Sequence, residues 1–234
     1  MDDRPDSPDK AGFLRRLGLL VYAPGRLGDH LRSRPVWWDA LVLGALLLAA
    51  ANLAIPADVW ADFLRTQQLS GGGGVGAGEM AEPVRGDLIR ISASIGGSVA
   101  WVLFMFISAG IMAFIFAFVL GDEGRFRQYL AGTAHAALLT GMGALLVSPL
   151  KAARRDPELT LSVGTFLQGA LRDTYLGSVL GALDLFGLWA WVVMGIVFSR
   201  FDERRSAGSA VGIVLGLSLL LVGVVSWFQY RSAG

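Results

Sequence analysis

The longest uncharged stretch limits this chain most. Between Arg90 and Asp122 there are 31 residues without Asp, Glu, Lys or Arg. About 20 apolar residues in a helix are enough to cross a hydrocarbon core of about 30 Å. The chain is also 54% apolar, with a mean hydropathy of +0.56, well above that of an ordinary soluble domain. We therefore predict an all-α integral membrane protein.

Further apolar runs alternate with charged segments, and each is bounded by charged residues or by Pro56. The first run has 18 uncharged residues between Asp39 and Asp58, which is just long enough to cross. The pattern predicts a five-span domain over residues 37–230, with transmembrane helices at about 38–55, 95–120, 128–150, 184–201 and 208–230.

The segments outside these spans have their own character. Residues 1–12 are acidic and rich in proline, which predicts a disordered cytoplasmic tail and not a cleaved leader. Residues 13–36 predict an interfacial helix region broken at Pro24-Gly25. Its apolar face is expected to carry Phe13, Leu14, Leu17, Leu20 and Val21, with Arg15 and Arg16 on the opposite face.

Two outer segments are expected. Residues 57–90 predict a short surface helix followed by a glycine-rich linker at 71–78, to which we assign no binding function, because a phosphate loop would need a lysine and a helix start. Residues 151–158 are a charged loop, and 159–183 predict a surface helix that dives toward the membrane.

Lysine and arginine counts orient the spans. With the N-terminus inside, the inner segments hold 12 of these residues and the outer segments hold 8. Because cytoplasmic loops carry the excess of positive charge, this predicts an N-in, C-out topology. The cluster of Lys151, Arg154 and Arg155 falls on the less favoured side.

The composition argues against several kinds of chemistry. The chain has no cysteine, and its two histidines, His30 and His135, are far apart in sequence, so we expect no metal site and no cofactor. No basic patch alternates with aromatic residues, so nucleic acid is not an expected partner. No carboxylate pair or Ser/His/Asp order is present, and we expect no catalytic residues and no enzyme activity.

Asp184 heads an apolar run and has three possible roles: a helix cap at the membrane surface, a polar packing group, or part of a transport pathway. The 15 uncharged residues from Leu185 to Ser199 would rise only about 22 Å. Asp184 and Arg200 would then lie near the headgroups, which favours the cap.

Other polar residues within the spans are interpreted conservatively. His135 and Asn52 are expected to form hydrogen bonds between helices, although His135 is also a candidate proton relay with Asp184. Small residues at helical spacing predict close helix packing at Gly141, Gly208, Gly212 and Gly216. Aromatic residues at the ends of spans predict interface anchors at Trp37, Trp38, Trp189, Trp227 and Tyr230.

Three stretches resemble the Yip family of small polytopic membrane proteins, named for interaction with Ypt/Rab GTPases, and in particular its bacterial members. They are Tyr22–Trp37, Gly121–Leu130 and Leu183–Trp189, the last similar to an Asp-x-Phe-x-x-Trp entry into a span. The resemblance implies a five-helix domain with a cytoplasmic N-terminus, and a multi-pass location in the bacterial cytoplasmic (inner) membrane. It does not carry over the partner, because bacteria lack the vesicle machinery of the eukaryotic members.

The sequence thus leads to two functional expectations. The first is a non-enzymatic Yip-type membrane protein that works through helix packing and association with lipids or proteins, as a homo-oligomer or as a subunit with other membrane proteins. The second is a small transporter or channel that uses Asp184 with Asn52 or His135.

Overall fold

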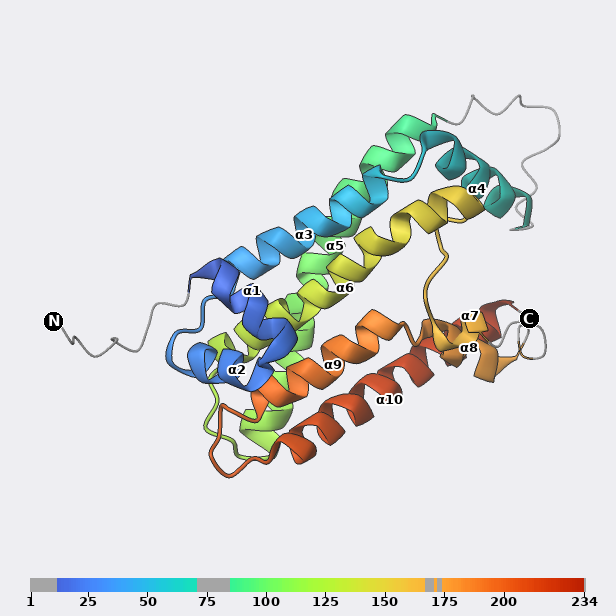
Figure 1. The fold of residues 1–234 in the computed structure, drawn as a ribbon. Coiled ribbons are helices and arrows are strands. Elements are labelled where there is room, and N and C mark those ends of the chain that lie inside the picture. Colours follow the sequence, from blue (N-terminus) through green and yellow to red (C-terminus); the bar gives the residue numbers. More distant parts are fainter. Residues whose placement is uncertain (1–11, 71–84, 167–170, 172–173, 234) are drawn as a thin grey trace, which may run out of the picture.

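The computed structural model describes residues 12–70, 85–166, 171 and 174–233, and in this part of the chain almost all regular structure is helical. The exception is an isolated bridge between Ser162 and Asp184. Figure 1 labels the helices α1 (Phe13–Tyr22), α2 (Pro24–Ser33), α3 (Trp38–Leu53), α4 (Ala57–Ser70), α5 (Gly86–Ala113), α6 (Phe126–Arg154), α7 (Val163–Phe166), α8 (Tyr175–Ala182), α9 (Leu185–Phe198) and α10 (Ala207–Ala233); a π-helix, η1 (Phe114–Val119), continues α5.

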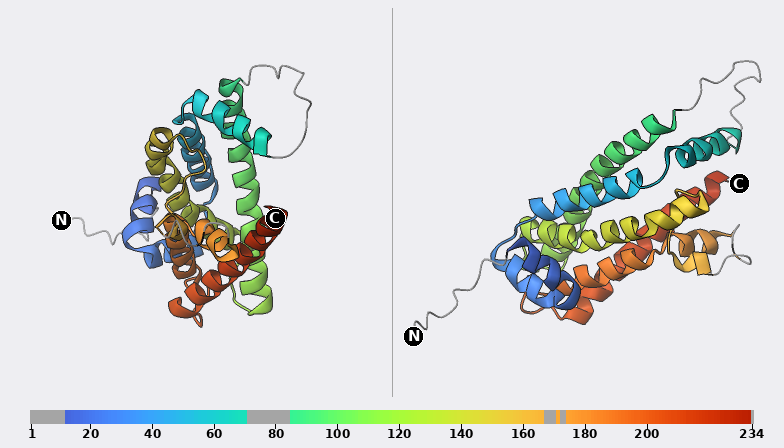
Figure 2. Two further views of the ribbon diagram at one scale, coloured as in Figure 1. Left: turned by 90° about the vertical axis from the view of Figure 1, so that its right-hand side faces the viewer. Right: turned by 45° about the horizontal axis from the view of Figure 1, so that its top comes forward.

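The long helices lie side by side along one direction (Figures 1 and 2). Helix α6 is central and packs against α3, α5 and α9, while α10 packs against α9 and α8. The short helices α1 and α2 lie at one end, and α4, α7 and α8 lie at the other (Figure 1). The all-α prediction is confirmed.

By length and composition, only some of these helices could cross a membrane. Three are long and apolar enough to cross a membrane by themselves: Gly86–Val119, Phe126–Arg154 and Ala207–Arg231. Helices α3 and α4 form a fourth candidate only as a pair, bent by 81°. Helix α9 has 14 residues, which is short for a span. The protein therefore has three or four candidate membrane-spanning helices by this measure, and α3 and α9 occupy the first and fourth of the five predicted ranges.

Two outer segments differ from expectation. Helix α5 starts at Gly86, so the end of the predicted 57–90 loop is helical; Asp87 lies in its first turn and pairs with Arg90 at 3.8 Å. Within 159–183 the described residues form the short helices α7 and α8 and no continuous helix, because the chain at Leu161–Val163 hydrogen-bonds to Leu183–Leu185 instead. The predicted tail up to residue 11 and the glycine-rich run 71–78 lie outside the described residues.

Small residues let the helices approach α6. A methyl group on Gly141 would lie 3.3 Å from Leu47 Cβ of α3, and one on Gly132 would lie 2.8 Å from the Phe198 ring of α9. Larger side chains at either position would push the neighbouring helix away. Beside this contact, four aromatic rings with centroid separations of 5.1 to 5.9 Å close the core: Phe116, Tyr129, Phe198 and Phe201.

The predicted faces of the first helix are partly wrong, although Leu20 is buried as expected. Arg16 is only 4% exposed and points into the bundle, whereas Leu14 is 80% exposed. The inward face consists of Leu19 and Leu20 together with Arg16. Hydrophobic periodicity missed this arrangement because it assigns every arginine to the polar side, while a buried carboxylate on α3 here gives Arg16 a partner inside.

Candidate functional site

A buried polar triad joins three helices near α1. The Arg16 guanidinium of α1 pairs with both carboxylate oxygens of Asp39 on α3, with Nη1 at 3.4 Å from Oδ1. The same Nη1 lies 3.3 Å from Nε2 of His135 on α6, which is fully buried. The triad ties α1 to the bundle.

The contacts also define the state of His135. Its Nδ1 lies 2.8 Å from the carbonyl oxygen of Ala131, and a carbonyl only accepts. Arginine only donates, so Nε2 must be the acceptor. His135 is therefore a neutral imidazole that donates to Ala131 and accepts from Arg16. This is a structural hydrogen-bonding role between helices.

The connection before α6 and the connection between α9 and α10 meet at the α1–α2 end of the molecule, where oppositely charged side chains join them. Arg205, after α9, donates to both carboxylate oxygens of Asp122 at 2.5 and 3.1 Å. In the opposite direction, Asp202 accepts from the backbone N–H of Glu123 at 3.0 Å. The α5–α6 and α9–α10 connections are thus linked by paired contacts in both directions.

Asp202 is almost fully buried, and it also organises its own loop. Its carboxylate also accepts from the side chain and backbone N–H of Arg204, at 2.7 to 3.1 Å. The hydrogen bond from the Arg204 side chain, followed by its backbone N–H, holds the pKa of Asp202 well below its ordinary value. At neutral pH this carboxylate is ionised and fully engaged, so it serves structure and leaves no spare proton acceptor.

Asp184 lies toward the other end and is the N-cap of α9. Its Oδ1 accepts from the backbone N–H groups of Phe186 and Gly187 at 2.9 and 3.0 Å. Two further bonds hold the backbone around it, from Leu185 N to Leu161 O and from Val163 N to Leu183 O, both 3.0 Å. The arrangement has the geometry of a cap on a helix start.

The structure does not bring Asp184, His135 and Asn52 together. Asn52 donates weakly, at 3.5 Å, to the carbonyl of Ala93 on α5, and its own carbonyl accepts from Trp60. No hydrogen bond joins any two of the three among the residues described. The partners that His135 has in the structure were not predicted: Arg16 contacts it directly, and Asp39 binds Arg16. Both are charged residues, Asp39 at the start of the first predicted span and Arg16 in the segment before it, which is the sequence signal that could have pointed to them.

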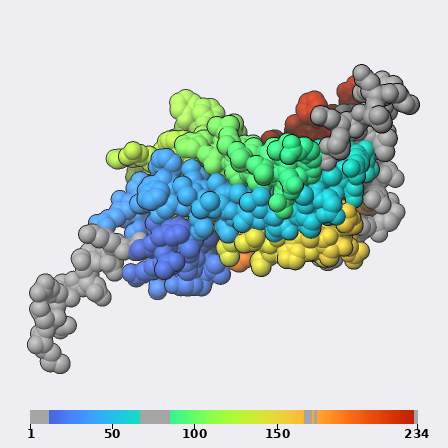
Figure 3. All heavy atoms as spheres, turned by 90° about the horizontal axis from the view of Figure 1, so that it is seen from above, coloured from blue at the N-terminus to red at the C-terminus, as the bar shows by residue number. Residues whose placement is uncertain are grey.

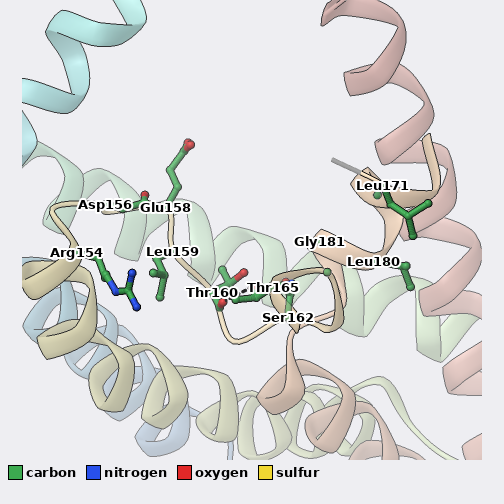
Figure 4. A pocket seen from close by; sticks show the side chains of 12 residues that line it. Arg154, Asp156, Glu158, Leu159, Thr160, Ser162, Thr165, Leu171, Leu180 and Gly181 are labelled. Carbon is green, nitrogen blue, oxygen red and sulfur yellow. Dashed lines mark hydrogen bonds between the residues drawn. The ribbon is translucent and has the colours of Figure 1, made fainter. Parts of the chain in front are cut away.

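A polar pocket of about 470 Å³ lies between the loop after α6 and α8 (Figure 4). Its hydroxyl groups are used locally: Thr165 donates to the carbonyl of Thr160 at 2.8 Å, and its Oγ1 lies 3.0 Å from Ser162 Oγ. Asp156 and Glu158 lie on another side of the pocket (Figure 4), and Asp156 accepts from the Glu158 backbone. The described lining therefore presents no nucleophile held by a base.

In the part of the chain that the structure describes, only one of the predicted packing glycines lies against another helix. Gly141 lies against α3, but a methyl group on Gly208, Gly212 or Gly216 would meet no atom within 4 Å. The close approach of α9 and α10 uses Gly195 instead, where a methyl group would lie 2.5 Å from Val211 Cα. The three α10 glycines are spaced four residues apart and leave an open, small-residue face on α10.

The predicted interface anchors lie at helix ends. Trp38, Trp189, Trp227 and Tyr230 are 40 to 61% exposed, whereas Trp37 is half-buried and packs edge-on against Phe106 of α5. Trp227 and Tyr230 both contact Tyr175 of α8. These three rings form an aromatic cluster near the end of α10, and such clusters are common at membrane interfaces.

Comparisons with known proteins add one likeness. The chain is 24% identical over 205 residues to the membrane protein YknW of Bacillus subtilis (strain 168), covering 87% of this chain and 85% of that protein. No family model matches the chain, and no solved structure matches it. The apolar helices together with this likeness identify a membrane protein.

Proposed function

We propose that this protein is a non-enzymatic, multi-pass membrane protein of the Yip type, in the bacterial cytoplasmic membrane, that works by associating with a second copy of itself or with other membrane proteins. The observation that carries the proposal is the open glycine face of α10. Among the residues that the structure describes, none covers Gly208, Gly212 or Gly216, although these glycines lie on an apolar helix. Small residues at four-residue spacing are typical of helices that pack against another helix in a bilayer.

The Yip-type part of the proposal is supported by where the similar stretches lie. Two of the three meet at the α1–α2 end, where Gln128 Nε2 donates to the Arg32 carbonyl at 2.6 Å. The third contains the Asp184 cap that starts α9. Each of the three stretches thus makes a contact that holds the helices in place, as expected for residues that define a family's fold.

A transport pathway through Asp184 is not favoured. Its carboxylate is committed to two backbone N–H groups, and the described part of the chain gives it no contact with His135 or Asn52. Near α1, Asp39 and Asp122 are likewise committed, to Arg16 and Arg205.

Cross-linking tests the proposal directly, because the chain has no cysteine. Gly212→Cys, oxidised in the membrane, should give a disulfide-linked dimer or a cross-linked complex with another protein. Gly96→Cys is the matched control, since a methyl group there also meets no atom within 4 Å but lies on α5. A Gly212→Cys protein that stays monomeric under both oxidants and bifunctional cross-linkers would refute association through α10.

A further inference from the structure

An apolar groove of about 700 Å³ runs between α3 and α5, on the face of the molecule shown in Figure 3. We call it the α3–α5 groove. Its floor consists of small residues from both helices, Ala45 and Ala49 of α3 with Ser94 and Ser98 of α5. Its size falls within the range of binding sites for small molecules.

The groove offers only apolar surface. Ser94 and Ser98 turn their hydroxyls to the carbonyls of Arg90 and Ala45, at 2.7 and 3.0 Å, so the floor presents no polar atom to the groove. Water gains no hydrogen bond there. The occupant must therefore be apolar where it touches the floor.

The two helices are held at a fixed separation. Ser98 bonds across to α3, and Gly44 of α3 leaves room for the Trp101 ring of α5, which a methyl group at position 44 would overlap. Asn52 adds a contact to Ala93 further along. The separation of the two helices, and with it the position of the groove floor, is thus set by the α3–α5 contact.

The walls decide between a lipid chain and another helix. Bulky side chains stand out on both sides, with Leu46 61% and Ile95 63% exposed. A second helix packs closely in a bilayer where small residues form the outer surface. In this groove the small residues lie below the bulky walls, so the backbone of a second helix could not come close to them. A single acyl chain is narrow enough to lie between the walls and reach the floor.

One end of the groove suits a lipid headgroup. Trp37 and Trp38 line that end, and the exposed Arg34 precedes them by three residues. Tryptophan is typical of the interfacial layer, and arginine binds phosphate through its planar guanidinium. The end lined by the tryptophan pair is thus where a headgroup would lie, whereas Arg90 beside the opposite end is paired with Asp87.

We propose that the α3–α5 groove binds one acyl chain of a phospholipid, with the phosphate beside Arg34 and the tryptophan pair. The proposal requires only that the protein lies in a bilayer. It goes beyond association through α10 and stands or falls separately from it.

Retention of lipid by the purified full chain tests this. Native mass spectrometry of the wild type in mild detergent should show one retained phospholipid per chain. Ala45→Leu with Ala49→Leu fills the floor and should reduce that occupancy at least tenfold. Ala50→Leu with Ala100→Leu is the matched control, because both alanines are exposed on the same two helices and neither lines the groove. Equal retention by the two variants, or none by the wild type, would overturn the proposal.

Two further measurements guard against misfolding and a different occupant. A phospholipid with a diazirine in its acyl chain, retained by the wild type, should label peptides from 41–53 and 91–106. Label confined to other helices would contradict the site. Leu46→Cys should give no disulfide-linked dimer in the membrane, and an efficient dimer would mean that a second copy covers the groove and would overturn the proposal.

Discussion

At the scale of single residues, Asp184 is the simplest to test. Replacing it with alanine removes the acceptor for Phe186 N and Gly187 N, and loss of an N-cap costs about 1 kcal/mol. Asp184→Ala should therefore lower the melting temperature in detergent by a few degrees. Asp184→Asn keeps an N-cap acceptor and should lose less. If the two variants melt together well below the wild type, the negative charge, and not the cap, is what matters.

Arg16 should be much more sensitive than an exposed arginine. Arg16→Leu leaves Asp39, with its side chain only 14% exposed, without its partner, and breaking a buried pair costs about 3 kcal/mol. Arg16→Leu combined with Asp39→Asn should recover part of this loss, because no unpaired charge remains. Thermal unfolding of the two variants measures the difference.

The control for Arg16 is Arg155. It pairs with Asp58 and Asp62 at 2.8 and 2.7 Å, but its side chain is 52% exposed. Exposed pairs contribute about 0 to 1 kcal/mol, so Arg155→Leu should change the melting temperature little. An Arg16→Leu protein as stable as Arg155→Leu would contradict the buried triad.

These residues show what sequence can and cannot foresee. A cap such as Asp184 is local, since donor and acceptor lie within three residues, and its position before an apolar run predicts it. The Arg16–Asp39–His135 triad joins residues up to 119 positions apart. Hydrophobic periodicity holds no information on such a contact, and it assigned Arg16 to the wrong face.

At the scale of helices, the contact of α9 with α10 depends on one glycine. A methyl group at Gly195 would lie 2.5 Å from Val211 Cα, which is backbone and cannot rotate away. Gly195→Ala should therefore force the helices apart and lower the melting temperature, as overpacking typically costs about 1–3 kcal/mol.

Gly212→Ala is the control for that substitution. It lies on α10, one residue beyond Val211, and meets no atom within 4 Å. In the monomer it should be neutral or slightly stabilising, since alanine favours helix more than glycine does. Equal destabilisation by both substitutions would show that the glycines act through helix propensity and not through packing.

The two loops at the α1–α2 end predict a dependence on pH. The pKa of Asp202 is lowered in the folded chain, mainly by its hydrogen bonds from Arg204, so its contribution to stability is present above its unfolded pKa of about 4 and is lost as the pH falls below that value. Asp202→Asn should be less stable than the wild type at pH 7, and the difference in melting temperature should shrink toward pH 3. A difference that stays constant across this range would contradict the assignment.

For the whole molecule, the apolar runs in the sequence predict where the helices lie more reliably than they predict where each helix begins and ends. The all-α architecture and the approximate place of every long helix were predictable, because 20 apolar residues leave few alternatives. The ends were not predictable: α5 begins at Gly86, and the chain at Leu161–Val163 pairs with Leu183–Leu185 at the start of α9, since capping and bridging are decided by neighbouring segments. The burial faces needed the packed structure as well.

Topology is the prediction that tests the whole arrangement. Helix α1 and the end of α10 lie at opposite ends of the bundle (Figure 1), as expected if an odd number of helices crosses the bilayer. The α1–α2 end also gathers the arginines of both helices and of the 121–127 and 199–206 connections, which the positive-inside rule places in the cytoplasm. A reporter fused after Gly234 should therefore be active only outside the cytoplasm, and one inserted at Glu123 only inside. Between these two positions lie α6, α9 and α10, so if both reporters prove cytoplasmic, the short helix α9 does not cross.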